Sequence, residues 1–309
     1  MTYIYLTAES SLPFGPIDQL HSIIMVDKQI LKLPSGTIVP RMIYGTAWKK
    51  FSTDALVFQA LKAGFRGVDT ACQPKHYRED LVGQGIAAFL KDQATKDTGL
   101  TRENLYIQTK FTPINGQDLK QPLPYSLNST LEDQVRQSTK TSLENLQISY
   151  IDTLVLHSPL ATLEDTARVW QTMEEIRSTG IVRNIGLSNT TLDIVLALVS
   201  HTNIKPSVIQ NRLYSDTDYD KKLREWATGE GVVYQSFWTL TANPHLLRAA
   251  AVISYANQLS ISCEQSLYSS VLKEDICIIN GTTSQKHMAE DLALLSSYDV
   301  PGKSLEDLI

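Results

Sequence analysis

Short apolar runs alternate with longer amphipathic segments along the chain from about Met42 onward. Eight such runs occur, most of them bounded by Gly, Asn, Asp or Pro: MIYGTAW (42–48), FRGVDTA (65–71), LYIQTKF (105–111), IDTLVLHS (151–158), NIGLSN (184–189), SVIQNRLY (207–214), GVVYQSFW (231–238) and ICIING (276–281). They are almost continuously apolar, as is typical of strands that are buried on both faces. The pattern therefore predicts eight parallel strands joined by helical crossovers.

The segments between these runs have the features of amphipathic helices. In TLEDTARVWQTMEEIRSTG, Thr162 is the expected N-cap, apolar residues follow at helical spacing, and Gly180 provides a stop. QVRQSTKTSLENLQ and TLDIVLALVSHTN are also expected to form helices. Eight strand-helix units without a GxGxxG motif favour an α/β fold of the (β/α)8 TIM barrel type over a doubly wound sheet. The earlier segment QILKLPSGTIVP predicts a β-hairpin that closes the bottom of the barrel.

Residues 25–309 are expected to form a single barrel domain, and residues 1–24 an N-terminal extension of unknown role. The net charge of -5 disfavours nucleic acid and anionic membrane surfaces as partners, so a small molecule is the expected ligand. Three scattered cysteines without a CxxC pair indicate a reducing, cytoplasmic setting, with neither a disulfide framework nor a zinc site. The first residues do not have the features of a signal peptide, and no segment has the apolar length of a membrane span.

Four proton-handling side chains lie at or just after predicted strand ends, where the active sites of such barrels are found. Asp69 closes the second run, Lys110 and His157 lie near the ends of the third and fourth, and Tyr77 follows in the loop DTACQPKHYRED (69–80). When a hydride reaches a carbonyl carbon, negative charge builds on the oxygen and an acid must supply a proton. A lysine ammonium favours the phenolate form of a tyrosine, and an aspartate keeps the lysine charged. Each residue alone has an ordinary structural explanation, but their joint placement indicates a site for carbonyl reduction.

The sequence resembles the aldo-keto reductase family from about Gln29 to Leu295. The motifs with this likeness are LPSGTIVPRMIYGTAW (33–48), GFRGVDTA (64–71), YIQTKF (106–111), SLENLQISYIDTLVLHSP (142–159) and GIVRNIGLSN (180–189). The resemblance implies an oxidoreductase that transfers a hydride from NAD(P)H to an aldehyde or ketone. It also implies a catalytic tetrad in which Tyr77 donates the proton, Asp69 and Lys110 support it, and His157 orients the carbonyl.

The resemblance further implies a set of ligand-binding residues. Ser188, Asn189 and Gln210 fall where the family hydrogen-bonds the nicotinamide carboxamide. The other expected cofactor-binding residues are Thr46, Ala47, Gln235, Ser236, Phe237, Trp238, Thr239, Thr282, Thr283, Ser284, His287, Glu290 and Asp291. The expected walls of the substrate pocket are Trp48, Tyr125 and Trp238.

Several positions depart from the family pattern. Seven residues separate Asp69 from Tyr77 where the family has four, so the segment 73–75 is an apparent insertion. Gln235 stands where the family stacks a tyrosine on the nicotinamide, and Phe237 or Trp238 is the expected replacement.

The adenosine 2′-phosphate site and the C-terminus also depart from the pattern. Gly281 and His287 stand where the family has a lysine and an arginine for the phosphate. The segment TTSQK (282–286) precedes the predicted helix HMAEDLALL (287–295), whose N-terminus can receive a phosphate. NADPH is therefore the expected cofactor, with NADH as the alternative. No C-terminal substrate loop is expected after SLEDLI (304–309), which implies an open pocket or closure by a second subunit.

Two other functions are consistent with the same motifs. The first is a biosynthetic enzyme of this fold that acts on an imine, enone or dehydration substrate. The second is a cofactor-binding regulatory subunit with little turnover, which the retention of all four tetrad residues disfavours. A monomer or a homodimer is expected in each case.

Overall fold

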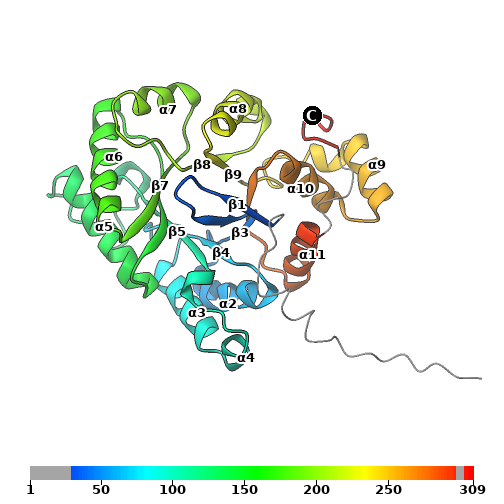
Figure 1. Cartoon of the computed structure of the whole chain (residues 1–309), viewed down its shortest axis with the longest axis horizontal. Helices are drawn as coiled ribbons and strands as arrows, with labels where there is room; N and C mark the ends of the chain where they lie inside the picture. Colours follow the sequence, from blue (N-terminus) through cyan, green and yellow to red (C-terminus); the bar gives the residue numbers. More distant parts are fainter. Residues whose placement is uncertain (1–28, 297–302) are drawn as a thin grey trace, which may run out of the picture.

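Eight parallel strands close into a barrel in the order β10-β3-β4-β5-β6-β7-β8-β9. Figure 1 shows the computed structural model, which describes residues 29–296 and 303–309. The strands are β3 (Met42–Gly45), β4 (Gly67–Asp69), β5 (Tyr106–Phe111), β6 (Ile151–Leu156), β7 (Val182–Ser188), β8 (Val208–Arg212), β9 (Val233–Phe237) and β10 (Cys277–Asn280). Each overlaps one of the eight apolar runs, so the predicted (β/α)8 barrel is confirmed. The predicted extension 1–24 lies outside the described residues.

Helices surround the barrel on its outside (Figure 1). They are α2 (Thr53–Ala63), α3 (Glu79–Lys91), α4 (Gln93–Lys96), α5 (Leu131–Leu146), α6 (Leu163–Ser178), α7 (Leu192–Val199), α8 (Lys221–Gly229), α9 (Ala250–Leu259), α10 (Cys263–Lys273) and α11 (Gln285–Ser296). The Thr162 side chain accepts a hydrogen bond from the Asp165 amide and caps α6, as predicted. Gly180 follows α6 with φ +83°, a conformation that glycine adopts readily and that ends the helix. Among the described residues, no helix is both long enough and apolar enough to span a membrane.

The predicted hairpin is present and closes the N-terminal end of the barrel. Its strands β1 (Ile30–Lys32) and β2 (Ile38–Pro40) pair antiparallel across the centre of the barrel (Figure 1). Ser35 donates to the Asn184 side chain at 2.6 Å, and Asn184 in turn donates to the Thr37 hydroxyl at 2.9 Å. Asn184 is fully buried on β7, so these bonds fix the hairpin to the barrel interior.

The apolar core has two parts, as expected for a barrel inside a ring of helices. The larger part lies between the strands and the helices and includes Trp170, which is fully buried and donates its indole N–H to the Ile204 carbonyl at 2.8 Å. The smaller part includes Leu33 and Val39 of the hairpin segment together with Val208 of β8. The hairpin therefore contributes apolar side chains to the barrel interior as well as hydrogen bonds.

Candidate active site

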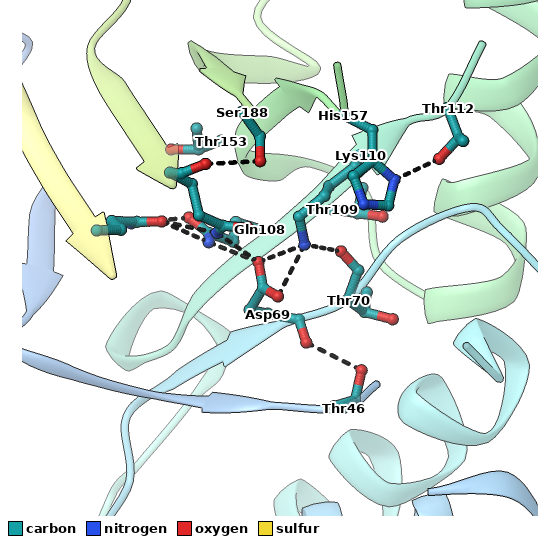
Figure 2. A network of polar contacts seen from close by, with 12 residues as sticks. Thr46, Asp69, Thr70, Gln108, Thr109, Lys110, Thr112, Thr153, His157 and Ser188 are labelled. Carbon is teal, nitrogen blue, oxygen red and sulfur yellow. Dashed lines mark hydrogen bonds and ion pairs between the residues drawn. The ribbon is translucent and has the colours of Figure 1, made fainter. Parts of the chain in front are cut away.

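Asp69 and Lys110 form a buried ion pair at the ends of β4 and β5 (Figure 2). The Lys110 ammonium donates to both Asp69 carboxylate oxygens at 2.7 Å and to the Thr70 carbonyl at 2.8 Å. The Lys110 side chain is only 1% exposed, and this burial lowers the pKa of its ammonium while the Asp69 carboxylate acts in the opposite direction. All three donors of the ammonium are therefore engaged.

His157 directly follows β6 and is held from several sides. Its Nδ1 is hydrogen-bonded to the Thr112 hydroxyl at 2.7 Å, as Figure 2 shows, and its backbone carbonyl accepts from the Asn189 side chain at 2.8 Å. Burial, with a smaller effect of the Lys110 charge, lowers the pKa of His157 to about 3. The imidazole is therefore neutral near physiological pH, and its Nε2 has no hydrogen-bond partner in the described part of the chain.

The lengthened loop between β4 and α3 brings the Tyr77 ring to the same place. The backbone amides of His76 and Tyr77 donate to the Gln73 carbonyl at 3.2 and 3.0 Å, so the additional residues are taken up in a tight turn. The Tyr77 ring lies edge-on to the His157 ring, with centroids 6.1 Å apart. The Lys110 Nζ lies 5.3 Å from the centroid of the Tyr77 ring.

The electrostatic environment of Tyr77 differs from the prediction. Burial, followed by the charge of Asp69, raises the pKa of the Tyr77 phenol. The predicted net lowering of that pKa is wrong for this arrangement, because burial and the Asp69 charge outweigh the attraction of the Lys110 ammonium, which Asp69 and Thr70 already engage. The Tyr77 hydroxyl has no hydrogen-bond partner within residues 29–296 and 303–309.

A cavity of about 860 Å³ opens at this end of the barrel. The predicted site residues that line it are Ala47, Trp48, Asp69, Tyr77, His157, Ser188, Asn189, Gln210, Phe237, Trp238, Thr239, Thr282, His287, Glu290 and Asp291. They come from the strands β4, β7, β8 and β9, from the loops that follow β3, β4, β6, β7, β9 and β10, and from α11. The structure thus brings most of the predicted residues together around one cavity.

Five residues predicted to bind the cofactor do not line the cavity: Thr46, Gln235, Ser236, Thr283 and Ser284. The Thr46 hydroxyl donates to the Asp69 backbone carbonyl at 2.9 Å, so it supports the end of β4 (Figure 2). Ser236 is hydrogen-bonded to Thr239 at 2.8 Å and is fully buried. Gln235 is also fully buried and is bonded to other glutamines inside the barrel, so it has no face to offer a ligand.

Tyr125 is likewise not a wall of the cavity, and its predicted role in substrate binding is wrong here. It is 5% exposed, and its ring packs against Phe111 with centroids 5.7 Å apart. Its hydroxyl donates to the Thr112 carbonyl at 2.8 Å. Tyr125 therefore holds the backbone of the residue whose side chain contacts His157.

Sequence reasoning missed Lys49, which lines the end of the cavity near β10. Its ammonium donates to the Gly281 carbonyl, and a Cβ built on Gly281 would lie 3.9 Å from this Nζ. The signal in the sequence was a lysine directly after the first apolar run, MIYGTAW (42–48). Lys286 and His287 line the same end, together with the carboxylates of Glu264, Glu290 and Asp291.

The two ends of the cavity differ in chemistry, which fits a long ligand that is polar at both ends. Ser188, Asn189 and Gln210 present hydroxyl and amide groups at the end near Asp69, and charged side chains of both signs lie at the other end. Within the described ranges, no group of three or more His, Cys, Asp or Glu is arranged to hold a metal ion.

Comparison with known proteins identifies the family. Residues 42–242 match the model of the Aldo/keto reductase family. The chain belongs to the aldo-keto reductase family. An aldo-keto reductase of Mycolicibacterium paratuberculosis is 30% identical over 78% of this chain and 74% of its own length. Aldo-keto reductase AKR2E4 of Bombyx mori is 31% identical over 60% of this chain, and methylglyoxal reductase DkgA of Escherichia coli is 27% identical over 62%. These alignments span 58% of AKR2E4 and 60% of DkgA.

Solved structures of aldo-keto reductases have the same fold. The structure of Bombyx mori AKR2E4 in complex with NADP superposes with a TM-score of 0.71, at 23% identity, and covers 90% of each chain. A reductase from Brucella melitensis gives a TM-score of 0.71 at 21% identity and covers 90% of this chain and 96% of its own.

In this aldo-keto reductase, the described C-terminal residues 303–309 pack against α8. Glu306 accepts from Lys221 at 2.8 Å and from Arg224 at 3.4 Å, and Leu305 is fully buried. These residues do not line the cavity.

Proposed function

We propose that this protein is an NAD(P)H-dependent carbonyl reductase that acts on an aldehyde or a ketone. The proposal is supported by one observation above all. Tyr77, His157 and the Asp69–Lys110 pair lie at the end of a cavity that also presents Gln210. Membership of the aldo-keto reductase family supports it further.

In the proposed mechanism, the cofactor supplies the hydride when bound, and the side chains control the carbonyl oxygen. The mechanism uses the Nε2–H tautomer of the neutral His157, in which the Thr112 hydroxyl donates to Nδ1 and Nε2–H donates to the carbonyl oxygen. Tyr77 then gives its proton to the oxygen as negative charge develops there. The buried Lys110 ammonium, 5.3 Å from the ring centroid, stabilises the resulting phenolate, and Asp69 keeps this ammonium in place.

NADPH is the proposed cofactor, and NADH is the alternative. The structures of Bombyx mori AKR2E4 and AKR2E5 were solved with NADP and NADPH. Lys49 and Lys286 in this chain provide cationic groups at the far end of the cavity, and His287 provides an imidazole there. Gln210, Ser188 and Asn189 would hold the nicotinamide carboxamide.

The substrate is proposed to be a small carbonyl compound. The related DkgA is named a methylglyoxal reductase, and a relative from Fragaria ananassa is named a D-galacturonate reductase. We further propose a single catalytic domain over residues 25–309, in a cytoplasmic monomer or homodimer. The unpaired cysteines Cys72, Cys263 and Cys277 support a reducing location. Light scattering on the purified protein tests the oligomeric state, and cell fractionation tests the location.

The test of the proposed activity is the oxidation of NADPH and NADH in the presence of a panel of aldehydes and ketones, followed by cofactor absorbance. Tyr77→Phe is expected to lower kcat by at least about 100-fold, because general acid catalysis contributes that much or more. Tyr150→Phe is the matched control, since Tyr150 stacks between Arg102 and Arg183 and does not line the cavity. Undiminished turnover by Tyr77→Phe would refute the proposed acid.

A further inference from the structure

Three glutamine side chains form a hydrogen-bonded cluster inside the barrel beside Asp69. This cluster, the glutamine layer, consists of Gln108 on β5, Gln210 on β8 and Gln235 on β9. Gln108 and Gln235 are fully buried and Gln210 is 3% exposed. Strand register pairs Gln108 with Asp69 and Gln210 with Gln235. Interior layers of (β/α)8 barrels consist mainly of bulky apolar side chains, so three amides here require a reason.

Gln108 and Gln235 form a reciprocal amide pair. The Gln108 Nε2 donates to Gln235 Oε1 at 2.8 Å, and the Gln235 Nε2 donates to Gln108 Oε1 at 3.0 Å. The Tyr106 hydroxyl adds a bond to Gln108 Oε1 at 2.9 Å. Turning one amide over would place donor against donor, and turning both over would point Gln108 Oε1 at the Asp69 carboxylate, so the cluster as a whole has one stable orientation.

This pair fixes the Asp69 carboxylate. The second N–H of Gln108 donates to Asp69 Oδ1 at 2.6 Å, and Gln210 donates to the same oxygen at 3.0 Å. Hydrogen bonds to an ionised acceptor are stronger than those between neutral groups. The carboxylate is thereby held with both of its oxygens on the Lys110 ammonium.

The pair also fixes Gln210, which lines the cavity. Gln210 uses one N–H on Asp69 and donates the other to Gln235 Oε1 at 2.9 Å. Its remaining polar atom, Oε1, has no hydrogen-bond partner among the described residues. The glutamine layer therefore holds one acceptor in a defined position at the cavity.

We propose that Gln108 and Gln235 are positioning residues, which hold Asp69 against Lys110 below Tyr77 and hold Gln210 with its acceptor available to the cofactor. The inference rests on the proposed function for its kinetic consequences. A ligand N–H that binds Gln210 is therefore linked, through the amides of Gln108 and Gln235, to the Asp69–Lys110 ion pair. This ion pair supports Tyr77, the proposed acid. Cofactor binding and proton transfer then depend on the same two buried side chains, neither of which contacts a reactant.

The test uses Gln108→Leu and Gln235→Leu, which remove the amide at similar volume. Each is expected to lower kcat by about 10- to 100-fold, because small displacements of reacting groups have effects of this size. The KM for the carbonyl compound is expected to stay within about twofold, since neither residue contacts it, and the Kd of NADPH is expected to rise about fivefold through Gln210. The kcat of the double variant is expected to be no lower than that of the less active single variant, because either substitution breaks the same amide pair.

Asn184→Leu is the matched control, because it also removes a buried amide from the barrel interior but at the hairpin end. It is expected to lower the melting temperature and leave kcat and the Kd of NADPH unchanged. If the glutamine variants behave in the same way, the layer only fills the interior and the proposal is overturned. Gln235→Met, with a flexible side chain of similar volume, replaces the leucine variant where that does not fold.

The proposed reductase function fails separately, if the wild-type protein oxidises neither NADPH nor NADH with any carbonyl compound. The NADPH titration then tests the glutamine layer by itself, and an unchanged Kd in both variants overturns it. A crystal structure of the Gln235 variant needs no ligand at all. Rotation of the Asp69 carboxylate and the Gln210 side chain is expected, and retention of both positions contradicts the proposal.

Discussion

The indole ring of Trp48 stacks on the imidazole ring of His76, with centroids 3.7 Å apart. The Trp48 amide also donates to the His76 carbonyl at 2.8 Å, which ties the loop after β3 to the lengthened loop after β4. Trp48 is 56% exposed and has φ +65°, a backbone conformation that is unfavourable for a bulky residue. Both rings line the cavity, so this pair forms one of its walls next to Tyr77.

Trp48→Ala is expected to raise the KM for an aromatic aldehyde by about tenfold, with a smaller effect on kcat. An aromatic contact contributes about 0.5–1.5 kcal/mol beyond the area that it buries, and both the wall and its support by His76 are lost. Steady-state kinetics measure the effect. Phe51→Ala is the control, because Phe51 is 83% exposed and lies in the same connection but does not line the cavity. Equal effects of the two substitutions would contradict a specific role for Trp48.

His157 is expected to make the protein less stable in acid. Its pKa is lowered to about 3 in the folded protein, whereas the unfolded chain takes up the proton near pH 6.5. The unfolded state therefore binds more protons between these values, and stability is lost as the pH falls from about 6.5 toward 3, by up to about 1.4 kcal/mol for each pH unit. Urea unfolding near neutral pH and near pH 5 measures this loss. The loss of stability between these pH values should be smaller in His157→Gln. It should be unchanged in His201→Gln, which alters an exposed histidine.

Lys49→Met is expected to weaken NADPH binding by about tenfold and NADH binding much less, if its ammonium contacts the 2′-phosphate. A charge-assisted hydrogen bond contributes about 1.5–3 kcal/mol, which is sufficient for this change. Tryptophan fluorescence titration with each cofactor provides the measurement. Lys50→Met is the control, because Lys50 is the exposed neighbour and does not line the cavity. Equal weakening of both cofactors would place Lys49 on a group that they share.

Gly83→Ala is expected to destabilise the protein by about 1–3 kcal/mol or more, through a clash between α3 and α5. A Cβ at this position would lie 2.1 Å from the Asn145 carbonyl oxygen, and backbone cannot move aside cheaply. Gly229→Ala, at the end of α8, meets no atom within 4 Å and is expected to be neutral or slightly stabilising. Thermal unfolding compares the two, and similar melting temperatures would show that the α3–α5 contact adapts.

Local patterns in the sequence were sufficient for the fold and for the charged pair of the site. Strands buried on both faces require continuous apolar runs, so all eight could be recognised from the order of apolar and polar residues. Asp69 and Lys110 could be paired because the ends of neighbouring parallel strands lie side by side in a barrel. The resemblance to a family then supplied Gln210 and its neighbours.

Contacts across the barrel could not be predicted in this way. Gln108 and Gln235 are 127 positions apart, and nothing local to either residue indicates that their amides meet. The contact between Lys49 and Gly281 depends on how two loops fold toward each other. Tyr125 was predicted as a wall because it lies in a long loop, but the loop folds back and buries it.

The hairpin at the N-terminal end has a consequence for which parts of the barrel tolerate change. Ser35 and Thr37 are bonded to Asn184 inside the barrel, and Leu33 and Val39 pack in the same apolar cluster as Val208. None of these side chains lines the cavity, so this end of the barrel is built for stability and the other end carries the candidate site. Stability and ligand binding can therefore be altered separately, by substitutions at opposite ends of the same strands.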